Sequence, residues 1–499
     1  MSRFHELRDT QSVGNNDMLR ITSSGRIPRR VMKTGQSHEN EYANVVIVCA
    51  PAILSKMMGS LHPAGALYEK PVNIRLAKEA HQHLVAVLER RGVIVRDVRD
   101  ILLERVNWSV GDRVCLENLA FKCLSYVFKE DSSAPANGSE TDSSGEKKTI
   151  NEASSYYVSD QYKQAVIEEM GKQQLVDIIL TNPTVVISPS QRDTGFTATY
   201  QFEPLSNIIF VRDQQITTRK GIVMARLRSQ QRQREVDIME FCFRKLGLDV
   251  IGRIPHPGHL EGGDFFPLGE KLCLIGIGPR SDWAAVEYLM ERDLLGTDTV
   301  AVVKDEFEQK QERMHLDTVF NILGDDCCIM LEEMMGADSR TKRVVDEYIV
   351  CQSADSESGS DSSKRIGRYI LRRQDVEFSS FMRENGFTII PVTDEEQLSY
   401  GCNILNLGNG DVISIERNTA RRIACSKAFK GTIEYLDFTA VTCMYGGVHC
   451  ATQVVSRERG SGRNGRLQQT TKNANRSNNR TIDVYGGADS GDSEKEMSS

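Results

Sequence analysis

The sequence predicts an α/β protein in which one unit of strands and a helix recurs along the chain. Short apolar runs typical of buried strands alternate with amphipathic helical patterns. The same order also repeats, namely two short strands joined by a turn, a helix, and a further strand. Together with the N-terminal unit we count five copies, and repeats of this size favour a closed radial or stacked architecture.

The first unit begins with an apolar strand at 45–49, followed by a helix over 73–91 and a strand over 93–95. Asn73 suits the N-cap of the helix, and Gly92 stands where a left-handed residue commonly ends one. An apolar stripe lies between them at helical spacing. We therefore expect an amphipathic helix that crosses between two neighbouring strands.

A helical stretch interrupts the α/β pattern after this unit. Residues 112–129 and 160–181 have helical periodicity and flank a segment at 131–155 that is rich in Ser, Gly and charge. We expect an inserted helical subdomain over about 100–182, with a low-complexity segment inside it.

Four further units follow this insertion. Their first strand pairs are expected within 207–218, 264–275, 317–330 and 403–415, their helices over 229–246, 282–291, 375–383 and 418–427, and their last strands over 248–251, 300–303, 388–390 and 431–436.

The ends of the chain and one internal stretch have the composition of segments without a core. Residues 1–42 are expected to form a flexible N-terminal arm, 352–364 a second low-complexity insert, and 456–499 a disordered tail. The catalytic α/β unit is therefore expected to occupy 43–455.

The overall composition favours a small-molecule partner. With 62 Lys and Arg against 69 Asp and Glu, the net charge of -7 indicates neither nucleic acid nor an anionic membrane as the main partner. Apolar runs are too short for a membrane-spanning helix, which needs about 18 residues. The 12 cysteines are scattered without a CxxC pair or a secretory leader, so we expect reduced thiols and a cytoplasmic protein.

Polar residues recur at the beginnings of the predicted units. Arg212 and Asp213, Glu261-Gly-Gly-Asp264, and His315-Leu-Asp317 are three such groups. If the units are arranged radially, these groups converge on one central cleft. His315 and Asp317 would share a face if Leu316 lies in a strand, although a structural histidine beside an exposed aspartate fits the same pattern.

Glu261 and Asp264 flank a diglycine that permits close backbone approach to a ligand, but an ordinary hairpin entry would look the same. Since His256 and His259 precede them, a zinc site is conceivable, yet the ligand spacing of known sites is absent. We expect no metal and no organic cofactor.

Cys450 follows the glycine-rich stretch Tyr445-Gly-Gly-Val-His. A free cysteine is more often a small buried hydrophobe than a nucleophile. The thiolate is the reactive form, so catalysis would require a polar or cationic environment, which a guanidinium substrate could itself supply.

Taken together, these motifs resemble arginine deiminases of the guanidino-group-modifying superfamily. The resemblance covers most of 43–455 and rests on the number, order and spacing of its motifs. They are Leu67-Tyr-Glu-Lys, Asn207-Ile-Ile-Phe-Val-Arg-Asp213, Arg232 before Glu235, Glu261-Gly-Gly-Asp264, Leu274-Ile-Gly-Ile-Gly-Pro-Arg280, His315-Leu-Asp317, Asn403-Ile-Leu, Glu416-Arg-Asn-Thr and Gly446-Gly-Val-His-Cys450.

The resemblance implies a five-bladed pseudo-symmetric α/β propeller that hydrolyses L-arginine to L-citrulline and ammonia through a covalent thiouronium on cysteine. It also implies roles for ten residues. Cys450 matches the nucleophile, His315 the general acid and base, Asp213 and Asp317 the pair that grips the guanidinium, and Glu261 a supporting carboxylate. Positions that line the pocket or hold the amino-acid end of arginine are matched by Asn207, Phe210, Arg232, Asp264 and Arg280.

One position departs from the family pattern. Arginine deiminases carry an arginine five residues before the nucleophile, and this chain has Tyr445. Hydrolysis of another guanidine, amidino transfer to an amine, and a non-catalytic guanidine-binding protein therefore remain alternatives. The basic stretch beyond 456 lacks interleaved aromatic residues, which makes nucleic-acid binding a weak alternative, and a homo-oligomer is compatible with the sequence.

Overall fold

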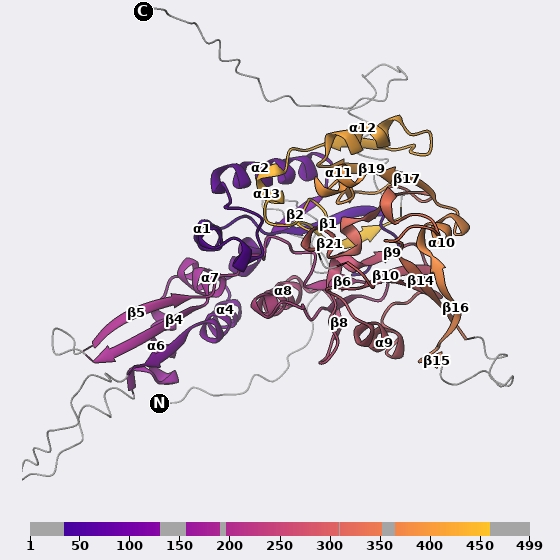
Figure 1. The fold of residues 1–499 in the computed structure, drawn as a ribbon. Coiled ribbons are helices and arrows are strands. Elements are labelled where there is room, and N and C mark those ends of the chain that lie inside the picture. Colours follow the sequence, from indigo (N-terminus) through magenta and orange to yellow (C-terminus); the bar gives the residue numbers. More distant parts are fainter. Residues whose placement is uncertain (1–33, 130–155, 190–195, 309, 352–364, 460–499) are drawn as a thin grey trace, which may run out of the picture.

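The structure is a computed structural model that describes residues 34–129, 156–189, 196–308, 310–351 and 365–459. A main α/β body carries an arm of helices and strands that projects to the lower left in Figure 1. The predicted low-complexity segments at 131–155 and 352–364, and the predicted tail beyond 459, lie outside the described residues.

Five sheets of the main body share one pairing scheme. In each, a middle strand pairs antiparallel with one neighbour and parallel with the other. With the middle strand second, the sets are β21 (Gln453–Glu458), β1 (Tyr42–Val48) and β2 (Ile94–Asp97); β6 (Gln215–Thr217), β7 (Ile222–Met224) and β8 (Val250–Arg253); β9 (Phe265–Pro267), β10 (Leu272–Ile277) and β11 (Thr299–Lys304); β12 (Phe320–Ile322), β13 (Cys327–Leu331) and β17 (Thr388–Val392); and β18 (Leu405–Asn406), β19 (Asp411–Ser414) and β20 (Thr432–Tyr435).

A helix connects the two parallel strands of each set, as parallel neighbours require a crossover. These helices are α2 (Ile74–Arg90), α8 (Gln233–Leu246), α9 (Trp283–Glu291), α10 (Phe378–Glu384) and α12 (Arg417–Cys425). The third sheet is extended by β14 (Val344–Val350), β16 (Tyr369–Glu377) and β15 (Arg365–Ile366). In the first sheet the earliest and the latest strands of the chain lie side by side.

Short helices occupy the connections of the main body. They are α1 (Ile53–Leu61), α11 (Asp394–Leu398) and α13 (Thr439–Thr442), with 3₁₀ turns η1 (Ala64–Ala66), η2 (Gln230–Arg232), η3 (Gly262–Asp264), η4 (Gln311–Arg313), η5 (Leu316–Thr318) and η6 (Glu332–Met334). The turns η3 and η5 contact each other, which joins the two motifs that begin at Glu261 and His315.

The inserted subdomain is not purely helical, as the sequence had suggested. It contains α3 (Val98–Leu103), α4 (Val110–Cys123), α6 (Asp160–Glu169) and α7 (Lys172–Thr181), and also a sheet of β3 (Ser125–Phe128), β4 (Pro183–Pro189) and β5 (Phe196–Phe202). Residues 125–128, predicted as helix, form a strand because Tyr126, Val127 and Phe128 favour extended backbone and pair with β4.

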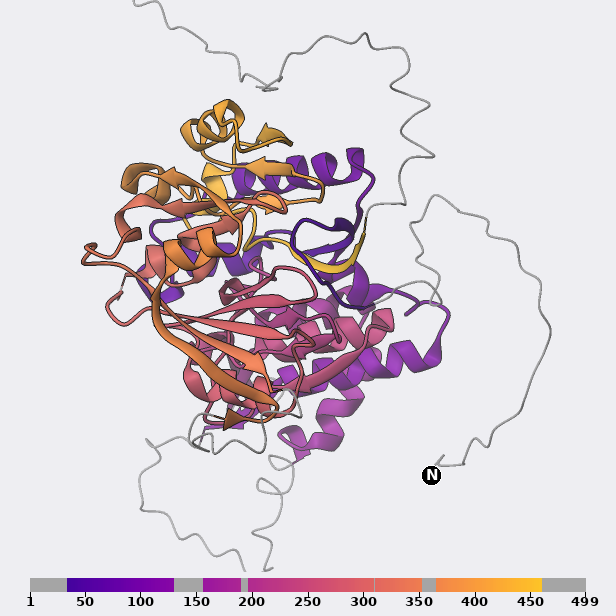
Figure 2. The same ribbon diagram turned by 90° about the vertical axis from the view of Figure 1, so that its right-hand side faces the viewer.

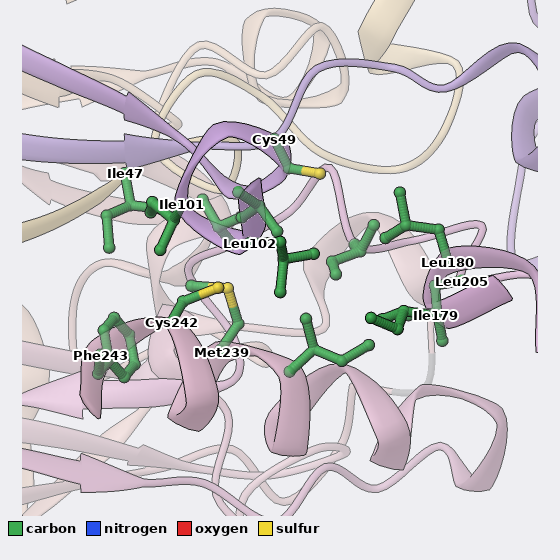
Figure 3. Packing of buried hydrophobic residues seen from close by; sticks show 14 of the residues in the cluster. Ile47, Cys49, Ile101, Leu102, Ile179, Leu180, Leu205, Met239, Cys242 and Phe243 are labelled. Atoms are coloured by element: carbon green, nitrogen blue, oxygen red, sulfur yellow. The ribbon is translucent and has the colours of Figure 1, made fainter. Parts of the chain in front are cut away.

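The insertion is anchored to the main body by a shared apolar core. Figure 3 shows Ile47 of β1, Ile101 of α3, Ile179 of α7 and Met239 of α8 in this core, and all four side chains are essentially fully buried. Burying each such side chain stabilises the fold by roughly 1.5–3 kcal/mol. Figure 1 shows the strands β4 and β5 of the insertion projecting away from the main body, and in Figure 2 purple helices of the insertion lie behind the lower part of the main body.

The packed chain extends beyond both predicted boundaries, 43 and 455. Gln36 and Glu39 are buried, and β21 continues to Glu458. Arg457 binds both, with Nη2 2.5 Å from an oxygen of Glu39 and Nε donating to Gln36. The charged residues in these two segments led us to expect solvent exposure. The charges of Glu39 and Arg457 can nevertheless be buried, because each is paired with the other.

Two further local expectations differ from the structure. The condition under which His315 and Asp317 would share a strand face is not met, because η5 begins directly after His315. The helix expected over 375–383 begins only at Phe378, since the Glu377 side chain caps it by accepting hydrogen bonds from the backbone of Ser379 and Ser380.

No helix within the described ranges is long and apolar enough to cross a bilayer. All 12 cysteines lie in those ranges, and none is in a disulfide there.

Candidate active site

Cys450 lies in the turn that connects α13 to β21 and is 2% exposed. Its Sγ accepts a hydrogen bond from Asn403 Nδ2 at 3.1 Å and lies 3.5 Å from Asp317 Oδ2. Burial raises the pKa of the thiol well above its ordinary value, and the negative charges of Asp317 and Asp213 raise it further. Before a cation enters, the sulfur therefore holds its proton at neutral pH.

His315 and Glu261 form a buried acid–base pair beside this thiol. His315 Nε2 donates to Glu261 Oε2 at 2.8 Å, and neither side chain is exposed. Burial alone would lower the pKa of His315, but Asp213 and the hydrogen bond to Glu261 outweigh burial and raise that pKa to about 10. Burial likewise opposes ionisation of Glu261, yet His315 holds the pKa of this carboxyl at about 2. The pair is a salt bridge at neutral pH.

Asp213 and Asp317 each use one carboxylate oxygen and leave the other without a hydrogen bond to any described residue. Asp213 Oδ2 accepts from Arg232 and Asp317 Oδ2 from His449, at 2.8 and 2.7 Å. The other oxygens, Asp213 Oδ1 and Asp317 Oδ1, are buried and unpartnered, as is His315 Nδ1. His315 Nδ1 lies 3.9 Å from Asp213 Oδ1. Two free acceptors and a free ring nitrogen thus stand near the thiol.

Gly263 brings these free atoms together. A Cβ added to Gly263 would lie 2.9 Å from both Asp317 Oδ1 and His315 Nδ1, so the diglycine lets the backbone of η3 approach the two side chains closely. The sequence motif Glu261-Gly-Gly-Asp264 therefore has a packing reason, which the hairpin interpretation would not require.

The five predicted substrate-binding residues fall into two groups. Asn207 and Arg232 line an open cavity of about 1080 Å³ between α1, α8 and the end of β5. Asn207 Nδ2 donates to Ala66, and Arg232 pairs with Asp213 and Glu235. Phe210 packs against the turn before Cys450, because its ring lies where any side chain at Gly446 would have to go.

Asp264 and Arg280 support the acid–base pair more than they face this cavity. Asp264 accepts hydrogen bonds from the backbone of Leu316 and from Ser281 Oγ, which holds the turn after His315. Burial raises the pKa of Asp264 to about 6. Arg280 lies 3.8 Å from Glu261 and donates to Gln311.

Tyr445 stands on the turn that leads to Cys450, with a positive φ of 62°. Its pKa is raised by burial and by the carboxylates of Glu312 and Glu69. This position, where the resemblance predicts an arginine, therefore holds a neutral phenol in the field of two acidic side chains.

Sequence reasoning assigned no role to two residues that touch the thiol loop. Asn403 contacts the sulfur itself, and His449 donates through Nδ1 to Asp317 while its ring stacks on Phe266. Both residues stand in the quoted motifs, so the motifs signalled their importance. Their contacts, however, join segments more than forty residues apart in the chain.

Asp213, Glu261 and His315 also have the donor types of a metal site, with their ligand atoms within 4.8 Å of one another. The geometry fits proton transfer better. Glu261 Oε2 is already engaged by the N–H of His315, and a protonated imidazole cannot coordinate a metal.

Comparisons with known proteins identify the family of the chain. The family model of arginine deiminase matches residues 65–457. The chain belongs to the arginine deiminase family. Within that family, it is 24% identical over 381 residues to an arginine deiminase of Halobacterium salinarum, covering 59% of this chain and 75% of that protein. It is also 24% identical over 410 residues to one of Staphylococcus aureus strain MRSA252, covering 79% and 91%.

Solved structures show more distant similarity. One is a dimethylarginine dimethylaminohydrolase from Pseudomonas aeruginosa in complex with citrulline, with 14% identity, 84% of this chain and all of that chain covered, and a TM-score of 0.42. Another is the N-terminal domain of ArgZ, a cyanobacterial arginine dihydrolase, with 16% identity, coverage of 55% and 80%, and a TM-score of 0.37.

Proposed function

We propose that this chain is an arginine deiminase that hydrolyses L-arginine to L-citrulline and ammonia. The observation that carries the proposal is the cluster of the Cys450 thiol, the free oxygens of Asp213 and Asp317, and the free Nδ1 of His315 in one buried site. Guanidinium is a planar cation with several N–H donors, so two unpartnered carboxylate oxygens are the acceptors that it needs.

Binding of the cation prepares the nucleophile. Asp213 and Asp317 hold the guanidinium so that its central carbon faces Cys450 Sγ. The positive charge offsets the field of the two carboxylates that raise the pKa of the thiol, so the thiol releases its proton to solvent as the substrate enters and the thiolate forms. Substrate binding and nucleophile activation are thus the same event.

His315 then moves the protons. The thiolate adds to the guanidinium carbon, and protonated His315, whose pKa is raised to about 10, gives a proton to one nitrogen, which leaves as ammonia. A thiouronium remains on sulfur. Neutral His315 next takes a proton from water as the water oxygen attacks the same carbon. The carbon–sulfur bond breaks, and citrulline and the thiolate are released. Glu261 keeps the imidazole oriented and stabilises its charged form.

The amino-acid end of arginine is proposed to extend toward the cavity lined by Asn207 and Arg232. Arg232 would donate its remaining Nη1 N–H to the substrate carboxylate, because its Nε and Nη2 bind Glu235 and one Nη1 N–H binds Asp213. Phe210 would pack on the aliphatic chain, and Asp264 and Arg280 would hold the acid–base pair in place. This assigns two of the five predicted substrate-binding residues a supporting position.

We further propose that the five sheets form the blades of a pseudo-symmetric propeller over about 43–455. Their common pairing scheme and the sheet that joins the earliest and latest strands support this architecture. A cytoplasmic location and a homo-oligomeric state remain predictions.

Related guanidines are the second candidate substrates, and Tyr445 is the observation that favours them. Turnover of arginine, methylarginine, agmatine and peptidyl arginine should be compared, together with amidino transfer to an amine. Preference for agmatine would show that carboxylate recognition is absent. A protein that binds arginine without any turnover would support the non-catalytic alternative.

The decisive experiment measures citrulline and ammonia formed from arginine by the full-length protein, by Cys450→Ala and by His315→Ala. Both variants are expected to lose turnover, and a covalent adduct on Cys450 should be seen by mass spectrometry in the parent but not in Cys450→Ala. Cys425→Ala, which changes an exposed cysteine, serves as the matched control. Formation of citrulline by Cys450→Ala at the parent rate would refute the proposal.

A further inference from the structure

Asn403 makes four contacts that all converge on the nucleophile and its neighbours. It lies in the short connection between α11 and β18 and is fully buried. Nδ2 donates to Cys450 Sγ at 3.1 Å and to the carbonyl of Asp317 at 3.2 Å. Oδ1 accepts from the backbone N–H groups of His449 and Cys450 at 2.9 and 3.4 Å. The Asn403 amide thus binds the Cys450 sulfur, the backbone N–H groups of His449 and Cys450, and the carbonyl of Asp317.

The orientation of this amide is determined by its surroundings. A flipped amide would place two N–H groups of Nδ2 against the N–H groups of His449 and Cys450, and Oδ1 against the carbonyl of Asp317. All four contacts would be lost. Of the two orientations, only the one described therefore satisfies a buried amide, and it directs an N–H bond at the sulfur.

Neighbouring residues keep the amide in place. Asn321 Nδ2 donates to the carbonyls of Cys402 and Ile404, which flank Asn403 on both sides. On the opposite side, Gly447 leaves room for the amide, because a Cβ there would lie 2.5 Å from Asn403 Oδ1. Asn403 is thus packed from both directions, which gives its hydrogen bond to sulfur a fixed geometry.

The thiolate needs such a donor. Sγ faces the carboxylate of Asp317 and lies in the field of Asp213, so negative charge on sulfur is opposed by its surroundings. An amide N–H stabilises negative charge without adding a positive charge that would repel a guanidinium substrate. A lysine or arginine at this position would stabilise the thiolate but compete with the substrate for the two carboxylates.

We propose that Asn403 is a further catalytic residue, which stabilises the Cys450 thiolate through the Nδ2–H···Sγ hydrogen bond and anchors the nucleophile loop through Oδ1. Its part in the reaction rests on the proposed deiminase function. Its effect on the thiol does not, because thiol reactivity can be measured without turnover.

The test compares the full-length parent with Asn403→Asp and Asn403→Ala. The rate of alkylation of Cys450 by iodoacetamide is followed at fixed pH by mass spectrometry of the Cys450 peptide, which separates it from the other cysteines. Loss of a hydrogen bond to a charged group should slow alkylation by about tenfold to a hundredfold in Asn403→Ala. Asn403→Asp should be slower still, because its carboxylate repels the thiolate.

Steady-state kinetics with arginine provide the second measurement. The value of kcat should fall by about tenfold or more in both variants, while KM stays within about twofold, because Asn403 contacts the nucleophile and not the amino-acid end of arginine. If alkylation slows but the parent does not turn over arginine, the proposed function fails and only the stabilisation of the Cys450 thiolate by Asn403 stands.

Two further variants distinguish loss of the hydrogen bond to sulfur from general misfolding. Gly447→Ala keeps the asparagine but pushes its amide away, so it should slow alkylation in the same direction. Asn406→Ala removes a buried asparagine that binds Asn40 and Ile322 but not Cys450. This control should lower the unfolding midpoint and leave the alkylation rate unchanged. An alkylation rate within about twofold of the parent in folded Asn403→Asp or Gly447→Ala would overturn the proposal.

Discussion

The imidazole of His315 and the carboxylate of Glu261 face each other at 2.8 Å in a site that excludes solvent from both. Their pKa values move in opposite directions, to about 10 for His315 and to about 2 for Glu261. Each therefore keeps the other charged at neutral pH. The residue proposed to protonate the leaving nitrogen thus carries its proton before substrate arrives.

Glu261→Gln should therefore weaken both catalysis and the fold. Without the carboxylate, His315 loses its orienting partner, and kcat should fall by about a hundredfold or more. Removing one member of a buried ion pair should also lower the free energy of unfolding by about 3 kcal/mol near pH 6. Glu434→Gln, which changes a buried glutamate paired with Arg90 and Arg91, is the matched control with unchanged kcat.

This stability difference depends on pH in a defined direction. The pKa of His315 is raised above its ordinary 6.5, so its contribution is complete below pH 6.5 and is lost as pH rises toward 10. The pKa of Glu261 is lowered from 4.5, so its contribution is present above pH 4.5 and is lost as pH falls toward 2. Urea unfolding at pH 6 and pH 9.5 should show a larger difference between parent and Glu261→Gln at pH 6. An equal difference at both pH values would contradict the ion pair.

Tyr445→Arg should improve recognition of free arginine. An arginine at this position would add a charge-assisted hydrogen bond to the substrate carboxylate, and KM for arginine should fall by about tenfold while KM for agmatine does not fall. Tyr445→Phe removes only the hydroxyl and is the control. If KM for both substrates changes equally in Tyr445→Arg, the carboxylate does not lie near this turn.

Glu39→Gln tests whether the segment before β1 positions the active site. Glu39 pairs with Arg457 and lies 3.8 Å from Arg212, whose backbone N–H and Nε donate to the carbonyls of Cys450 and His449. Leaving two buried arginines without their carboxylate should lower the free energy of unfolding by about 3 kcal/mol and reduce kcat through the displaced loop.

The control for this prediction is Glu270→Gln, which changes an exposed glutamate in surface ion pairs and should alter the stability by less than about 1 kcal/mol. Thermal unfolding and initial rates measure both effects. Parent-like stability of Glu39→Gln would show that the buried pair makes no net contribution.

Removal of metal ions should leave turnover unchanged. The cluster of Asp213, Glu261 and His315 has metal-ligand types, but the His315–Glu261 hydrogen bond already engages one oxygen of Glu261 and keeps the imidazole protonated, and a protonated imidazole is a poor metal ligand. Dialysis against EDTA followed by citrulline measurement tests this. Loss of activity that is restored by zinc would reassign the cluster.

Local patterns in the sequence were sufficient for many elements. The apolar stripe after Asn73 predicted α2 within a residue or two, and the Asn73 side chain caps its N-terminus by accepting from Leu76. Such features depend on neighbours three or four residues away. The prediction was wrong where contacts with residues distant in sequence determine the local structure. Residues 125–128 form a strand and not a helix because β4 pairs with them, and Glu39 is buried because it forms an ion pair with Arg457.

The sequence by itself determined the α/β class, the order of the units, and the motifs that carry Asp213, Glu261, His315 and Cys450. Only the tertiary structure decided how these motifs meet: which oxygens stay unpartnered, that His315 begins a 3₁₀ turn, and that Asn403 touches the sulfur. The physical reason is that residue types and periodicity are local properties, whereas pKa values and hydrogen bonds depend on atoms that are distant in sequence and adjacent in space.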